Sequence, residues 1–167
     1  SEGSKALVFS QFTSFLAILR RRLEGVGIVY EYLDGQTRDR ERRVRRIVCS
    51  FPRQVDSWHF DAAWKAGTIE LELVPQGNLA ERIRAAGAGI GGFFTPTGYG
   101  TDLAKGKETR ELDGRMHVFE TPIHADFAFI KAERGDRWGN LTYRMTARNF
   151  GPVMATAAKV TIATVHE

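Results

Sequence analysis

Short strand-like runs alternate with amphipathic stretches along the first half of the chain. The runs are apolar or alternate apolar with polar side chains, which is typical of β-strands, and they lie at residues 6–9, 28–33, 47–50 and 69–74. Stretches with apolar side chains at helical spacing, or with mixed charge and a glycine after them, predict helices, and they lie around residues 12–23, 38–46, 56–66 and 78–86. We expect Asn78 to cap the last of these helices. Strands and helices that alternate at such short intervals predict a parallel sheet with helical crossovers.

The pattern changes after residue 107, where turn residues separate short strands. Two pairs of strand-like segments predict β-hairpins, and the pairs are 109–112 with 116–120 and 126–131 with 141–144. A last β-branched strand is expected at residues 160–165. The expected fold class is therefore α/β, a doubly wound and mostly parallel sheet with C-terminal β-hairpin elements, in a single composite domain over residues 1–167.

The composition is that of one globular domain. The chain has 167 residues, of which 43% are hydrophobic and 26% are charged, a balance that argues against a disordered or fibrous protein. The longest uncharged stretch, residues 85–101, is rich in glycine and threonine, so we expect a loop there and no membrane span. Cys49 is the one cysteine. We therefore expect no internal disulfide, no metal site and a location in the reducing cytoplasm.

The excess of positive charge is concentrated in the first quarter of the chain. Residues 1–46 hold ten Lys/Arg and six Asp/Glu, whereas residues 47–167 hold fourteen of each. Six of the arginines lie in residues 38–46, where Asp39 and Glu41 interleave them. Such a run is either a solvated helix face, which we favour, or a surface that contacts phosphates weakly.

Two short motifs allow a chemical and a structural interpretation. Residues 87–92, Gly-Ala-Gly-Ile-Gly-Gly, match the spacing of a dinucleotide-binding loop, but they follow a helix and lead to Pro96, so a plain loop is favoured. Glu70 and Glu72 share one face of a strand and could act as an acid–base pair. The solvated side of an alternating strand is the favoured interpretation of these two carboxylates.

Two N-terminal segments carry a first resemblance. Lys-Ala-Leu-Val-Phe-Ser-Gln-Phe-Thr at residues 5–13 and Gly-Ile-Val-Tyr-Glu-Tyr-Leu-Asp-Gly-Gln-Thr at residues 27–37 resemble the start of the second RecA-like lobe of Snf-type helicase-like ATPases. In that family this piece helps to grip the DNA backbone. The resemblance covers residues 1–43, and the family's phosphate-binding and magnesium-binding motifs are absent from this sequence. We therefore expect no ATPase chemistry and interpret the chain as a chimera.

Residues 44–167 resemble a different family. The segments that carry this resemblance are Arg-Arg-Ile-Val-Cys-Ser-Phe-Pro-Arg at 45–53, Glu-Leu-Glu-Leu-Val-Pro-Gln-Gly-Asn-Leu-Ala-Glu-Arg-Ile-Arg at 70–84, Phe-Phe-Thr-Pro-Thr-Gly at 93–98 and Thr-Ala-Arg-Asn-Phe at 146–150. Together they resemble the A (alpha) subunit of type I CoA-transferases that act on 3-oxoacids. Members of that family transfer CoA through a glutamate on the partner B subunit, which is nucleophilic catalysis by a carboxylate.

This second resemblance also implies which residues bind substrate. Gln76 corresponds to the glutamine of the family's Pro-Gln-Gly motif, where its amide can donate a hydrogen bond to a carboxylate or a developing oxyanion. The alternative is a purely structural role for Gln76 at the end of a strand. Thr97 and Gly98 lie in the turn that the resemblance places near the active-site cleft. No catalytic residue is expected in this chain, because the glutamate belongs to the partner.

The expected function follows from these implications. We expect an A-type CoA-transferase module whose partner is a B-type CoA-transferase subunit, with a CoA thioester and a carboxylic acid as substrates, and no permanently bound cofactor. The chain alone is expected to be inactive, to bind nucleic acid weakly or not at all, and to have no membrane partner. The alternative is a non-enzymatic α/β chimera that is purely structural or binds the DNA backbone weakly.

Overall fold

The computed structural model describes residues 44–52 and 57–166, which fall into two compact units. Among the described residues, the smaller unit holds 44–47 and 57–71, and the larger unit holds 48–52 and 72–166. The expected elements before residue 44 and the helicase-like segment 1–43 lie outside the described residues. The helix expected over residues 38–46 does not reach its predicted end, because residues 44 and 45 are irregular and Arg46 begins a strand.

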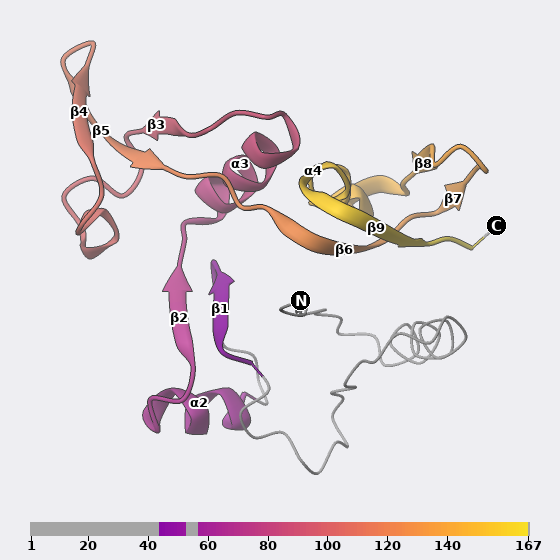
Figure 1. The fold of residues 1–167 in the computed structure, drawn as a ribbon, viewed down its shortest axis with the longest axis horizontal. Helices are drawn as coiled ribbons and strands as arrows, with labels where there is room; N and C mark the ends of the chain where they lie inside the picture. Colours follow the sequence, from indigo (N-terminus) through magenta and orange to yellow (C-terminus); the bar gives the residue numbers. More distant parts are fainter. Residues whose placement is uncertain (1–43, 53–56, 167) are drawn as a thin grey trace, which may run out of the picture. The chain divides into compact units, whose positions relative to one another are not determined.

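Two strands and one helix follow the expected order at the start of the described chain. Strand β1 (Arg46–Cys49) is followed by helix α2 (Trp58–Lys65) and strand β2 (Glu70–Leu73). Helix α2 ends at the cap residue Ala66, and Gly67 follows with a φ of +65°, a conformation that glycine adopts without strain. Strands β1 and β2 pair in parallel, since the amide of Glu70 donates to the carbonyl of Arg45 and the amide of Val74 to that of Cys49 (Figure 1).

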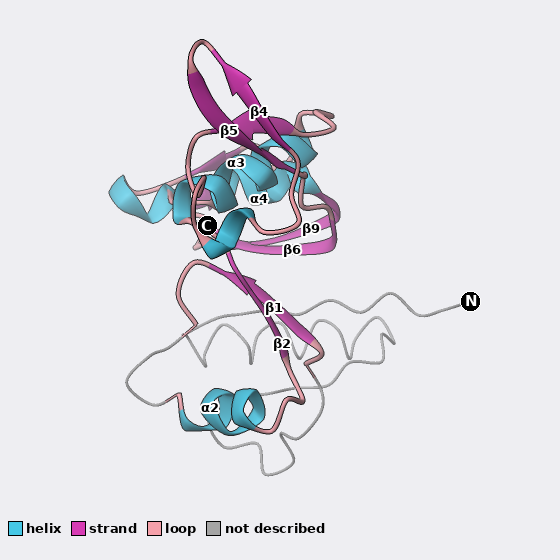
Figure 2. Ribbon diagram, turned by 90° about the vertical axis from the view of Figure 1, so that its left-hand side faces the viewer, coloured by secondary structure: helices cyan, strands magenta, loops and turns pink. Residues whose placement is uncertain are grey.

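Helices α3 (Gln76–Gly87) and α4 (Gly151–Ala157) pack against each other in the larger unit. Helix α4 also packs on strand β6 (Ala125–Lys131), which pairs in parallel with the last strand, β9 (Ala158–Thr164). Figures 1 and 2 show the two helices next to this strand pair. Small side chains fill much of this core, which is why the helices approach closely. The buried hydrophobic residues described in the larger unit are Val74, Ala85, Ala86, Val118, Ala128, Ile130, Ala132 and Ala157.

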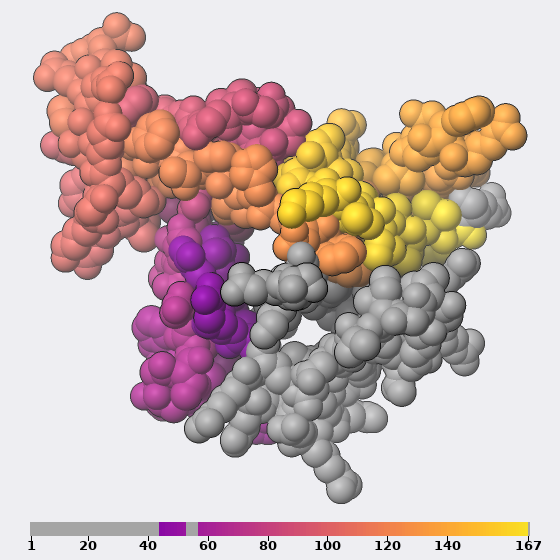
Figure 3. Space-filling view, viewed as in Figure 1, coloured from indigo at the N-terminus to yellow at the C-terminus, as the bar shows by residue number. Residues whose placement is uncertain are grey.

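An antiparallel sheet forms the other part of the larger unit. It contains β3 (Phe93–Thr95), β4 (Thr109–Leu112) and β5 (Arg115–Glu120) in the order β3-β5-β4. A short 3₁₀ helix, η1 (Asp102–Ala104), lies between β3 and β4. The predicted hairpin of residues 109–112 with 116–120 is confirmed, since β4 and β5 pair antiparallel. This hairpin projects from the unit in Figure 3. Asp113 and Gly114 both have positive φ, as a two-residue hairpin turn requires.

The second predicted hairpin has different partners from those expected. Residues 141–144 were expected to pair with 126–131, but β8 (Leu141–Thr142) pairs with β7 (Arg134–Gly135). The Asp136 carboxylate accepts hydrogen bonds from the amides of Trp138 and Asn140, and this closes a tighter loop than the one expected. A second 3₁₀ helix, η2 (Met145–Arg148), and α4 then carry the chain back to β9, so that β6 gains a parallel partner.

The α/β fold class with C-terminal hairpin elements is confirmed. Within the described residues, the parallel pairs are β1 with β2 and β6 with β9, and the antiparallel pairings involve β3, β4, β5, β7 and β8. Helix α4 was not expected. It is short and begins with Gly151-Pro152, a pair that reads as a turn in sequence, although proline is well suited to the first turn of a helix.

Candidate functional site

The first turn of α3 presents Gln76 to solvent. Strand β2 ends at Leu73, and Pro75 holds the N-cap position with φ −51° and ψ 137°. The helix therefore begins at Gln76, and the amide of Leu79 donates to the carbonyl of Pro75 over 2.8 Å. The Gln76 side chain is exposed. This places the first predicted site residue on the surface of the larger unit, at a helix start.

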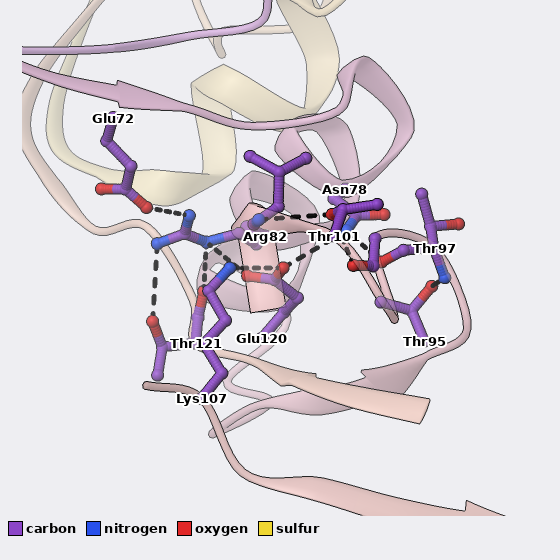
Figure 4. Close-up of polar contacts among 11 residues, drawn as sticks. Glu72, Asn78, Arg82, Thr95, Thr97, Thr101, Lys107, Glu120 and Thr121 are labelled. Atoms are coloured by element: carbon purple, nitrogen blue, oxygen red, sulfur yellow. Dashed lines mark hydrogen bonds and ion pairs between the residues drawn. The ribbon is translucent and has the colours of Figure 1, made fainter. Parts of the chain in front are cut away.

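Asn78 does not cap α3, as the sequence had led us to expect. The helix starts two residues earlier, and no side chain caps it. The Asn78 amide is instead buried inside the unit, where Nδ2 donates to Glu120 Oε1 over 3.3 Å and to the carbonyl of Thr97 over 3.4 Å (Figure 4). Asn78 thus connects α3 both to strand β5 and to the turn after β3.

Glu120 is a buried carboxylate with cationic partners. Only 3% of the residue is exposed, and it accepts a hydrogen bond from Lys107 Nζ over 2.8 Å. Arg82 Nε lies 3.7 Å from Oε2 of the same carboxylate. A charge removed from water in this way is tolerated only when it is paired and hydrogen-bonded, and these contacts together with Asn78 supply both conditions.

Arg82 joins three segments of the larger unit. Its Nη1 donates to Glu72 Oε1 over 2.6 Å, and its Nε donates to the carbonyl of Thr121 over 2.7 Å (Figure 4). Arg82 follows Asn78 by four residues, so both side chains lie on the same face of α3. The side chain of Glu72 is partly buried in this ion pair. The prediction that Glu72 lies on the solvated side of its strand is therefore wrong, whereas Glu70 is exposed as expected.

The cluster of Glu72, Asn78, Arg82, Lys107 and Glu120 is electrically balanced. Two carboxylates face two cationic side chains, and each charged group has a partner inside the cluster. Its chemical role is to hold α3, β2 and β5 together.

The other two predicted site residues lie in the turn between β3 and η1. Thr97 is exposed, and its amide donates to Thr95 Oγ1 over 3.2 Å. Gly98 has a φ of +92°, and its carbonyl accepts a hydrogen bond from Thr101 Oγ1 over 2.7 Å. The structure connects this turn to the helix of Gln76 through Asn78, so the predicted residues share one supported region.

Sequence reasoning missed the buried polar residues that support this region. One signal was present: Asn78 and Arg82 occupy the same helix face as Ala85 and Ala86, and all four are buried. Two polar residues in a stripe where apolar ones are expected indicate partners elsewhere in the fold. Their main partner, Glu120, lies far away along the chain, and no local pattern identifies it.

The glycine-rich segment 87–92 serves close packing. A Cβ atom at Gly87 would overlap Thr156 of α4, and one at Gly92 would overlap the ring of Phe119 on β5. Gly92 also has a φ of +155°. These contacts give Gly87 and Gly92 a steric role, whereas Gly89 and Gly91 meet open space, and they agree with the favoured interpretation of the segment as a loop.

The Cys49 thiol is the other nucleophile that the sequence pointed out, and it is partly buried. Burial raises the pKa of the Cys49 thiol above its ordinary value, although a hydrogen bond with the Phe51 backbone acts in the opposite direction. The thiol therefore stays protonated near neutral pH and is a poor nucleophile. No group of three His, Cys, Asp or Glu side chains in the described part of the chain is placed to hold a metal ion. Nor does that part contain a helix long and apolar enough to cross a membrane.

Comparisons with known proteins identify the family of this chain. The profile of the coenzyme A transferase family matches residues 23–167. The A subunit of 3-oxoadipate CoA-transferase from Pseudomonas putida is 73% identical over 124 residues, which cover 74% of this chain and 54% of the relative. The A subunit of succinyl-CoA:3-ketoacid coenzyme A transferase from Xanthomonas campestris pv. campestris is 52% identical over 126 residues, which cover 75% of this chain and 51% of the relative. The chain thus spans about half the length of the curated relatives it matches.

A solved structure shows the same fold. The crystal structure of glutaconate coenzyme A-transferase from Acidaminococcus fermentans aligns with a TM-score of 0.60 at 21% identity, covering 75% of this chain and 47% of that chain. The family match begins at residue 23, inside the segment that was expected to be helicase-like. The comparisons therefore confirm the resemblance to the A subunit of a CoA-transferase and give no support to a helicase-like lobe or a chimera.

Proposed function

Because the chain belongs to the coenzyme A transferase family, we propose that it is an A-subunit segment of a 3-oxoacid CoA-transferase. The observation that carries the proposal is the 73% identity to the A subunit of a 3-oxoadipate CoA-transferase. We take 3-oxoadipate as the first acceptor to test. Other 3-oxoacids come second, since a relative at 52% identity belongs to a succinyl-CoA:3-ketoacid transferase.

The proposed reaction takes place at a glutamate of a B-type partner subunit. The glutamate carboxylate attacks the carbonyl of the CoA thioester, and the thiolate of CoA leaves, so that an acyl–glutamyl anhydride forms. The thiolate then attacks the glutamyl carbonyl of the anhydride, which gives a glutamyl-CoA thioester and releases the first acid. The acceptor carboxylate then attacks the glutamyl-CoA thioester, which forms a second anhydride and releases the thiolate of CoA. The thiolate attacks the acceptor carbonyl of this anhydride, so that the new CoA thioester leaves and the glutamate is restored. The whole sequence is nucleophilic catalysis by a carboxylate.

In this proposal the chain contributes part of the substrate pocket. Gln76 is exposed in the first turn of α3, where its amide can donate to the substrate carboxylate or to the oxyanion of the attacked carbonyl. Thr97 and Gly98 form a turn tied to that helix through Asn78, which supports their assignment to the same pocket. CoA enters as a substrate, and the proposal requires no resident cofactor or metal.

The remaining partners are also proposals. A B-type subunit is the partner we propose, since the relatives named above are A subunits. Weak or absent nucleic-acid binding, the lack of a membrane partner and a cytoplasmic location stay predictions from the sequence.

Substitution of Gln76 tests the proposed pocket. In a complex of this chain with a B-type subunit, we expect Gln76→Ala to lower the rate of CoA transfer to 3-oxoadipate by about 10²–10³-fold, as the loss of one oxyanion donor typically does. Glu81→Gln is the matched control, because Glu81 is an exposed residue of the same helix. A complex that assembles but transfers no CoA to any 3-oxoacid contradicts the proposed function. An unchanged rate in Gln76→Ala assigns Gln76 to the scaffold.

A further inference from the structure

Asn78 lies on the opposite side of α3 from Gln76. The two residues are two positions apart, and successive residues of an α-helix are rotated by about 100°. Their side chains therefore leave the helix in nearly opposite directions, in agreement with an exposed Gln76 and a buried Asn78. Asn78 is thus placed to support the helix turn that carries Gln76 without reaching a ligand itself.

The hydrogen bonds of Asn78 fix the orientation of its amide. Asn78 has two partners, the Glu120 carboxylate and the Thr97 carbonyl, and both can only accept hydrogen bonds. The NH₂ group of the amide, and not its oxygen, must therefore face them. An amide NH₂ has two hydrogens, and this geometry uses both. With 4% of Asn78 exposed, water has little access to replace its bond to Glu120, whereas the bond to the Thr97 carbonyl is partly buried.

Glu120 gives Asn78 a rigid anchor. The carboxylate is held by Lys107 and lies beside Arg82, which itself binds Glu72 and the Thr121 backbone. These ion pairs attach α3 to β5 one helical turn beyond Asn78. The donor to the Thr97 carbonyl is therefore fixed in space by a network that does not include the turn itself.

We propose that Asn78 is a positioning residue that sets the placement of the Thr95–Gly98 turn relative to Gln76, and so aligns the two sides of the substrate pocket. This inference rests on the proposed function, since it assigns Gln76 and the turn to one pocket. No partner for the Thr97 carbonyl other than Asn78 is found among the described residues. Without the Asn78 amide, the turn keeps its internal bonds but loses this attachment to α3.

A double-mutant comparison separates positioning from a purely structural role. In the complex with a B-type subunit, Asn78→Ala is expected to lower kcat/KM for the 3-oxoacid by about 10–100-fold, because misplacement by about 1 Å can cost that much. In a Gln76→Ala background, Asn78→Ala should lower it by a clearly smaller factor, since one of the two sides of the pocket that it aligns no longer contacts the substrate. Asn78→Leu, which is close to asparagine in shape and size but has no donor, should act like Asn78→Ala, and Glu81→Gln should act like the unchanged chain. Equal losses in both backgrounds overturn the proposal.

Amide hydrogen exchange in the full chain provides a second measurement that needs no catalysis. In Asn78→Ala, the amides of Thr97 and Thr101 should exchange faster, while those at the tip of the β4–β5 hairpin should keep their rates. If Asn78→Ala does not fold, both measurements are made on Asn78→Ser, which keeps one donor. Unchanged exchange at Thr97 and Thr101 overturns the proposal. If the unsubstituted complex transfers no CoA, the proposed function fails, whereas the exchange rates still decide whether Asn78 couples α3 to the turn.

Discussion

At the residue scale, Arg82 illustrates how a charged side chain becomes part of a protein interior. Its guanidinium meets Glu72, Glu120 and the backbone and side chain of Thr121, so its planar set of donors is largely used. With 7% of the residue exposed, these contacts replace water almost completely. The balance of charge, more than the attraction of any one pair, makes the burial acceptable.

Removal of Arg82 should therefore be costly. Arg82→Ala leaves the Glu120 carboxylate buried beside a single cation and removes the ion pair of Arg82 with Glu72, so we expect a loss of about 3–5 kcal/mol in the free energy of unfolding, as for other broken buried pairs. Arg84→Ala is the control, because the exposed pair of Arg84 with Glu81 is worth about 0–1 kcal/mol. Urea denaturation followed by circular dichroism measures both values. Equal losses in the two variants would show that the cluster does not hold the larger unit together.

The same residues mark the limit of what the sequence could predict at this scale. Gln76, Thr97 and Gly98 were identifiable because they lie in short motifs that resemble a family, and their substrate-binding role stays a prediction. Asn78 was misassigned as a cap because asparagine at a helix start usually plays that part. Its true partner Glu120 is distant along the chain, and the pairing depends on how β5 packs against α3.

At the scale of elements, the antiparallel sheet and the segment that follows α3 approach each other through glycine. The Cβ atom of an alanine at Gly92 would overlap the Phe119 ring, and its φ of +155° is one that L side chains rarely adopt. We expect Gly92→Ala to lower the melting temperature clearly, since both strain and a displaced aromatic ring oppose folding. The neighbouring Gly91→Ala meets open space and should change it little. Thermal denaturation of the two variants side by side checks this, and equal melting temperatures would contradict it.

Elements were predictable where their determinants are local. The β4–β5 hairpin follows from two residues, Asp113 and Gly114, whose conformations define the turn. The partner of β6 could not be read in the same way, because parallel pairing with β9 requires a crossover through α4. That helix is short and rich in small residues, so its apolar periodicity is too weak to predict it.

At the scale of the whole molecule, the family match extends into the first quarter of the chain. The match begins at residue 23, whereas the resemblance alone had placed a boundary near residue 44. A parallel β/α segment of one family can look like that of another, because buried strands and charged helices recur in the same order. That residues 1–167 form one composite domain stays a prediction.

The last prediction concerns the chain without a partner. We expect the isolated chain to transfer no CoA, because the proposed nucleophile is a glutamate of a B-type partner. The carboxylates of the buried cluster in this chain are already ion-paired. Glu72 and Glu120 are held in ion pairs with Arg82 and Lys107, which lowers their availability to attack a thioester.

The measurement is CoA transfer from succinyl-CoA to 3-oxoadipate by the chain alone, by a B-type partner alone, and by the mixture. Activity only in the mixture is the expected result. Transfer by the chain alone, lost in Glu72→Gln or Glu120→Gln, would place the nucleophile in this sequence and overturn the proposed division of labour between the two proteins.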